Sequence, residues 1–101
     1  MRTYRVKSEQ DFTDRVANKD VELAITICQA ILDNLDTTKK NVYVLSVEIE
    51  EDEEIYDLSC RPEEFIVTLE RNLLILEDNE LYELCDQVLG AINYLKQKNK
   101  L

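Results

Sequence analysis

Carboxylate side chains crowd one central stretch of the sequence, and their chemistry is the most distinctive that the chain offers. The residues that we single out as candidates for partner binding are Glu48, Glu50, Asp52, Glu53, Glu54 and Asp57. Carboxylates transfer protons, hold divalent cations or attract basic protein surfaces. Catalysis would need two carboxylates in a cleft with different environments, whereas a polar run of this kind is typical of an exposed turn. The pattern therefore favours attraction of cations at a surface.

The groups that most other chemistry needs are missing from the sequence. There is no histidine, which is the commonest general base and the commonest zinc ligand. The one glycine, Gly90, falls inside a predicted helix, so neither a phosphate-binding loop nor a dinucleotide fingerprint can form. The acidic stretch also lacks the frame of an EF-hand, which leaves at most weak divalent binding. We therefore predict that the protein is not an enzyme and holds no cofactor or structural metal.

The three cysteines give no sign of a disulfide framework. Cys28, Cys60 and Cys85 are odd in number, widely spaced and never arranged as C-x-x-C, which also argues against a structural zinc site. Cys28 and Cys85 fall on apolar helix faces, which favours buried, inert thiols. The chain has no apolar run of membrane-spanning length and no secretory signal at its start, so we expect a cytoplasmic protein.

The formal net charge of −10 is unevenly distributed. Between Asn41 and Leu95 there are 15 acidic residues, against only Arg61 and Arg71. Such a surface repels nucleic acids and anionic membranes and attracts basic protein surfaces. The alternative is that the charge is a solvated surface that serves solubility alone.

A chain of 101 residues is the size of one domain with one core, so we predict a single domain over residues 1–101 that positions the carboxylates. Residues 1–7 are predicted to be either an edge strand or a frayed start. Two helices are predicted over residues 8–35: the first has Phe12 and Val16 inward, and the second is the central core helix, from Val21 to about Leu35.

Residues 42–60 alternate as expected for an antiparallel β-hairpin with a loop at Glu51–Glu54. The apolar alternation predicts the pairs Ile49–Tyr56, Val47–Leu58 and Leu45–Cys60. This register places Glu48 opposite Asp57 and leaves the acidic side chains together on the other face.

Residues 62–98 carry two apolar stripes separated by a short polar break, which predicts an antiparallel helical hairpin. The stripes are Phe65, Leu69, Leu73 and Leu76, then Leu81, Leu84, Val88, Ile92 and Leu95. The predicted fold class is α+β and mostly helical, in the order α-α-β-β-α-α.

This hairpin resembles the UVR motif, a helical hairpin of bacterial excinuclease subunits and some chaperone ATPases. The resemblance lies in the run Asp-Asn-Glu-Leu-Tyr-Glu-Leu-Cys at 78–85, followed by Val88, Ile92 and Leu95. Leu89 and Gly90 stand where the family usually has an Arg-Asp pair. The resemblance implies a protein-docking hairpin without chemistry of its own.

Three functions follow as hypotheses. The first is a small acidic, non-catalytic interaction module or regulator that docks on a basic surface of a larger protein, with no direct contact to nucleic acid or membrane. The second is a DNA-mimic inhibitor of a nucleic-acid-binding enzyme, because the length and charge resemble those of small acidic phage-encoded proteins. The third is a structural homodimer, expected if Val67 and Leu74 are both exposed.

Overall fold

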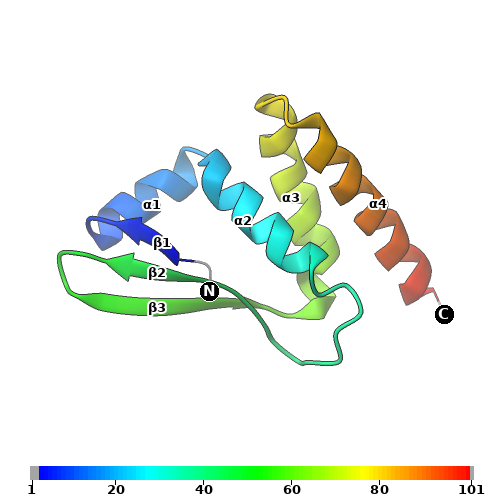
Figure 1. Ribbon diagram of the computed structural model, residues 1–101, viewed down its shortest axis with the longest axis horizontal. Coiled ribbons are helices and arrows are strands. Elements are labelled where there is room, and N and C mark those ends of the chain that lie inside the picture. The colour runs from blue at the N-terminus through cyan, green and yellow to red at the C-terminus, as the bar shows by residue number, and fades with distance from the viewer. Residues whose placement is uncertain (1–2, 101) are drawn as a thin grey trace.

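The computed structural model describes residues 3–100 and has the α+β architecture that the sequence predicts. The elements are β1 (Thr3–Val6), α1 (Glu9–Ala17), α2 (Val21–Leu32), β2 (Val42–Ile49), β3 (Glu54–Cys60), a 3₁₀ turn (Pro62–Glu64), α3 (Phe65–Asp78) and α4 (Tyr82–Asn99). Figure 1 shows the sheet on one side, the α3–α4 hairpin on the other, and α2 between them.

The first described residues form the strand β1. The predicted order α-α-β-β-α-α therefore lacked one element at its start. β1 pairs in parallel with β2, and β3 pairs with the opposite edge of β2, giving the sheet order β1-β2-β3. Tyr4 and Val6 alternate into the core, at 5% and 2% exposure, which is what secures the strand. With four residues, β1 is too short for its alternation to be told from a frayed start by sequence alone.

Each of the first two helices begins directly after a residue whose side chain caps it. The Ser8 hydroxyl accepts the Asp11 N–H at 3.1 Å, and the Asp20 carboxylate accepts the Leu23 N–H at 3.1 Å. The end of α2 was placed too late, because the chain leaves the helix after Leu32 and the Asn34 side chain donates to the Ala30 carbonyl at 2.7 Å. Asn side chains compete for backbone groups in this way and favour helix ends.

The inward position predicted for Val16 is wrong, since this side chain is 51% exposed. Helix α1 has no fully buried residue and contributes Phe12, which is partly buried against the sheet. A helix of nine residues over a four-residue edge strand covers little area, so of its two large apolar side chains only Phe12 is partly buried.

Helix α2 lies between two hydrophobic clusters, in agreement with its predicted central position. Leu23 and Ala30 pack with the sheet residues, whereas Ala24, Cys28 and Ile31 pack with α3 and α4. The predicted stripe of α3 is buried as Phe65, Leu69, Leu73 and Leu76. On α4 the buried residues are Cys85, Val88, Ala91, Ile92 and Leu95.

The predicted hairpin register is wrong by two residues. Ile49 pairs with Glu54 instead of Tyr56, and Val47 pairs with Tyr56 instead of Leu58. The reason lies in β1, because the Glu50 N–H bonds to the Val6 carbonyl at 3.0 Å and so continues the parallel ladder beyond the hairpin. The turn therefore occupies residues 50–53, one position earlier than predicted. The two-residue shift leaves the side chains of residues 45–49 and 54–58 on their predicted faces, and an irregularity between Tyr43 and Leu45 changes the register beyond them.

Within residues 3–100, no helix is both long enough and apolar enough to cross a membrane.

Candidate functional site

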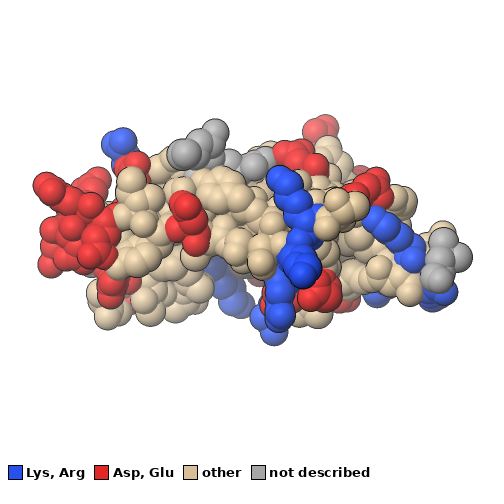
Figure 2. Space-filling view, turned by 90° about the horizontal axis from the view of Figure 1, so that it is seen from below, with Lys and Arg blue, Asp and Glu red and all other residues tan. Residues whose placement is uncertain are grey.

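The acidic side chains of the turn meet the start of α1 at one end of the molecule. We call this surface the acidic tip, and it consists of Glu9, Glu50, Glu51, Asp52, Glu53 and Glu54. All six side chains are exposed. Figure 2 shows the resulting patch of carboxylates at the end where the hairpin turns, with one basic side chain close beside it and the other basic side chains in view farther along the molecule.

Backbone bonds to β1 hold the turn in place. The Glu50 N–H donates to the Val6 carbonyl at 3.0 Å, and the Glu51 N–H donates to the Lys7 carbonyl at 3.0 Å. Glu53 closes the turn with a φ of 54°, a left-handed conformation that is uncommon outside glycine. The same strand leads directly into α1, so β1 brings the first helical turn alongside the hairpin.

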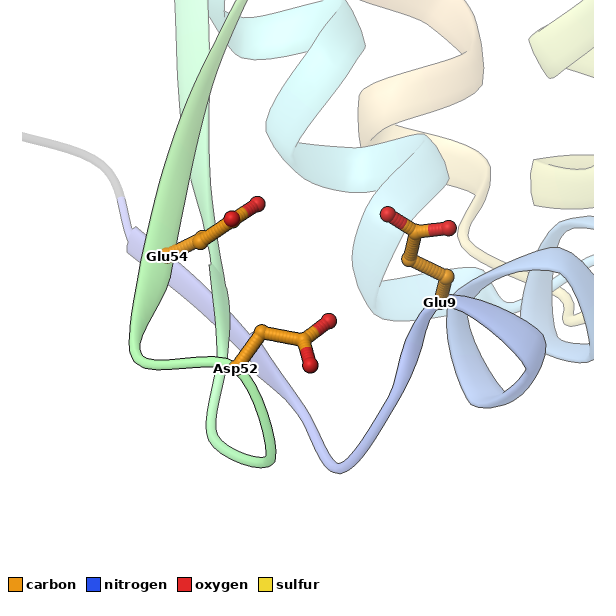
Figure 3. A group of neighbouring side chains, drawn as sticks. All are labelled: Glu9, Asp52 and Glu54. Carbon is orange, nitrogen blue, oxygen red and sulfur yellow. The ribbon is translucent and has the colours of Figure 1, made fainter.

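Three carboxylates of the acidic tip face one another. The side chains of Glu9, Asp52 and Glu54 have carboxylate oxygens that all lie within 4.8 Å of one another. Figure 3 shows Glu9 reaching from the start of α1 and the other two from the hairpin, with the three groups directed at one space. Oxygen ligands at this spacing have the chemistry of a hard-cation site, and their mutual repulsion favours any positive charge that enters.

The phenol of Tyr56 ties the two sides of the acidic tip together. Its hydroxyl donates to Glu54, and Glu9 Oε1 lies 3.5 Å from the same hydroxyl oxygen. The bond to Glu54, with the neighbouring negative charges, raises the pKa of Tyr56 from its ordinary 10.0 to about 12. The phenol therefore stays protonated and remains a donor at every physiological pH.

The carboxylates of the acidic tip form no ion pair within residues 3–100. The ion pairs of Asp11, Asp36, Glu48, Glu63, Glu64 and Glu70 all lie elsewhere. No lysine or arginine nitrogen of this part of the chain comes within 4.0 Å of a tip carboxylate. The tip carboxylates are therefore exposed to solvent without an ion-pair partner among these residues.

Two of the predicted partner-binding residues lie apart from the tip. Glu48 faces Ile55 across the hairpin and accepts an ion pair from Arg5 of β1 at 2.8 Å. Asp57 accepts the Ser46 hydroxyl at 2.6 Å farther along the same sheet face. The single acidic face that the predicted register implied is therefore divided, and Glu50, Asp52, Glu53 and Glu54 are the predicted residues that the structure brings together.

An open hollow of about 320 Å³ lies beside the turn. Its lining residues are Glu48, Ile49, Glu50, Glu53, Glu54 and Ile55. Ile55 is 64% exposed, so the hollow combines an apolar surface with carboxylates at its rim. This combination matches the side chains of lysine and arginine, which have an aliphatic stem and a charged end.

Sequence reasoning did not include Glu9 and Tyr56 in the site. Glu9 was visible only as an acid in a predicted first helical turn, and nothing in the sequence indicates that β1 pairs in parallel with β2. Tyr56 was assigned to the apolar face of the hairpin, yet it is 43% exposed because that face ends at the tip.

Comparisons with protein-family models, with curated proteins and with solved structures gave no significant match. The likeness of residues 62–98 to the UVR motif accordingly stays a prediction.

Proposed function

We propose that this protein is a non-catalytic interaction module of the cytoplasm whose acidic tip docks on a basic surface of a larger protein. The observation that carries the proposal is the convergence of unpaired carboxylates from α1 and the hairpin on one end of the molecule. Opposite charge on a partner would relieve the repulsion among them and would steer the encounter over a distance.

The hollow beside the turn supports a partner that presents lysine or arginine. A cationic side chain could lay its stem on Ile55 and its charged end among Glu50, Glu53 and Glu54. Tyr56 and the backbone bonds to β1 hold these acceptors in place before binding, which lowers the entropy lost on association.

The charge distribution gives less support to a DNA mimic. A mimic needs negative charges spaced along a face, as phosphates are spaced along a duplex. Away from the tip, Arg5 neutralises Glu48, Arg61 neutralises Glu64 and Lys96 lies 3.9 Å from Glu70. The run of five acids at Glu50–Glu54, none of which forms an ion pair within residues 3–100, favours local docking instead.

The test is an affinity capture from cell lysate with two variants of equal charge. The tip variant changes Glu50, Glu53 and Glu54 to Gln and Asp52 to Asn. The matched variant changes Glu22, Glu63, Glu83 and Asp86 in the same way, so it loses the same charge at exposed positions elsewhere. We expect a basic protein to be captured by the unchanged chain and the matched variant but not by the tip variant.

The captured complex should also weaken as salt is raised, because the contacts are exposed ion pairs. Equal loss of capture in both variants would mean that net charge alone is responsible and would contradict the proposal. Capture of a nucleic-acid enzyme that both variants weaken in proportion would favour mimicry.

A further inference from the structure

A second surface of the molecule has the opposite character from the acidic tip. A groove of about 410 Å³ runs between the α1–α2 corner and α3. Its apolar lining comes from Val16, Leu23, Ala24, Ile27, Leu74 and Ile75. Two of these side chains remain largely uncovered, with Val16 51% and Leu74 63% exposed. Val67, two turns before Leu74 on α3, is 50% exposed as well.

The charged residues around the groove balance one another. Lys19 and Arg71 supply two positive charges, and Asp20 and Asp78 supply two negative ones. Among the described residues, Arg71 and Asp78 have no oppositely charged partner within 4.0 Å. They are seven residues apart on α3, which places them two helical turns or about 10.5 Å from each other on one side of the helix.

The C-terminal end of α3 carries acidic residues, although the helix dipole favours basic residues there. Glu77 and Asp78 lie at the negative pole of α3, which has no basic residue in its last turn. Helix α4, by contrast, ends with Lys96 and Lys98. Acids at a helix C-terminus are unfavourable, so a positive charge brought there from outside would be stabilising.

We propose that the groove is the interface of a homodimer in which the α3 helices of two copies pack antiparallel. A two-fold axis between Leu74 and Ile75 places each Leu74 over the groove of the other copy. The same axis sets Arg71 of one copy opposite Asp78 of the other, twice. Each contact thus supplies the positive charge that the C-terminal end of α3 lacks.

Charge complementarity is the reason for naming a second copy as the occupant. A strongly basic partner would be drawn to the acidic tip rather than to a rim whose charges cancel. A two-fold contact requires a surface that is complementary to itself, and an apolar stripe with one arginine and one aspartate on either side of its centre has that property.

The test is sedimentation velocity of the full chain over a wide range of concentration. We expect a monomer–dimer equilibrium that Leu74→Asp weakens by about tenfold or more, the loss typical of a central apolar contact. The matched control is Leu89→Asp, because Leu89 is 45% exposed on α4 and does not line the groove. This control should dimerise as the unchanged chain does.

A charge swap tests the geometry itself. Arg71→Asp and Asp78→Arg should each weaken the dimer, and the double variant should regain most of the affinity because the swapped charges face each other again. Rescue within one chain is excluded by the separation along the helix. The circular dichroism of every variant should show that it is folded.

Three results would overturn the proposal: a chain that stays monomeric, a dimer that Leu74→Asp leaves intact, or a double variant no tighter than the single ones. The acidic-tip variant should dimerise normally. The test of the dimer and the test of the proposed function can therefore fail separately.

Discussion

At the scale of single residues, the acidic tip depends on one neutral group among many charged ones. Tyr56 is the donor that holds Glu54 beside Glu9, and its protonated state is part of the folded structure. Without this donor, the repulsion between the two carboxylates would push them apart. The tyrosine therefore presets the geometry of the tip without reducing its charge.

The raised pKa of Tyr56 predicts that the folded protein loses stability at alkaline pH. The folded-state pKa of about 12 lies above the ordinary 10.0, so the stability that the phenol contributes is complete below pH 10 and is lost as the pH rises toward 12. We predict that Tyr56→Phe removes part of the alkaline loss of stability, measured by urea unfolding at a series of pH values. An unchanged alkaline profile in the variant would show that the phenol is not coupled to folding.

Thiol labelling tests the residue environments independently of any partner. Burial raises the pKa of all three thiols, that of Cys28 to about 12, but Cys28 and Cys85 are buried whereas Cys60 is only partly buried. Since reagent reaches the more exposed thiol first, Cys60 should be alkylated first in the folded protein, with all three labelled after denaturation. Mass spectrometry with Cys60→Ser as control checks this, and rapid native labelling of Cys28 would contradict the packing of α2.

At the scale of elements, Asp20 connects β1 to α2. One carboxylate oxygen caps α2 through the Leu23 N–H, and the other accepts the Tyr4 hydroxyl at 2.8 Å. Tyr4 is 5% exposed, so its hydroxyl would lose its carboxylate acceptor if Asp20 were removed. This bond helps to seat the strand that anchors the acidic turn.

We predict that Asp20→Ala lowers the free energy of unfolding by about 2 kcal/mol, from a lost cap and a buried hydroxyl that loses its acceptor. Ser8→Ala removes a cap alone, so it should cost about 1 kcal/mol or less. Chemical denaturation of both variants provides the comparison. Adding Tyr4→Phe to Asp20→Ala should recover part of the loss, and no recovery would mean that the hydroxyl bond contributes nothing.

The elements differ in how much of them the sequence could predict. Helices α3 and α4 were predictable because their apolar stripes extend over several turns and end at clear polar breaks. The hairpin register was not, because apolar alternation allows any even shift and the deciding bond, from Glu50 to Val6, comes from a strand of four residues. The same strand also brings Glu9 to the tip. Because the pairing of β1 was not predicted, Glu9 was missing from the predicted site.

At the scale of the whole molecule, charge is sorted by position along a body of 46 × 32 × 19 Å. The acidic tip occupies one end, and the groove beside α3 has balanced charges around an apolar lining. A surface charged for function is expected to cost stability, since self-repulsion opposes the compact state. The acids at the tip are therefore expected to be neutral or unfavourable for folding.

We predict that the tip variant, with Glu50, Glu53 and Glu54 changed to Gln and Asp52 to Asn, melts at a higher temperature than the unchanged chain. The gain should shrink as salt is added, because screening removes the repulsion that the variant relieves. Thermal unfolding followed by circular dichroism measures it, with the matched variant as control. A lower melting temperature would show that the carboxylates support the fold rather than a partner.

The most direct measurement is a nuclear magnetic resonance titration of the isotope-labelled protein with a short peptide rich in lysine and arginine. The proposal predicts that amide shifts concentrate at Glu9, at residues 50–54, and at Ile55 and Tyr56, and that they fade with salt. Shifts spread evenly over the exposed acids of α3 and α4, or equal binding by the tip variant, would contradict a local docking site.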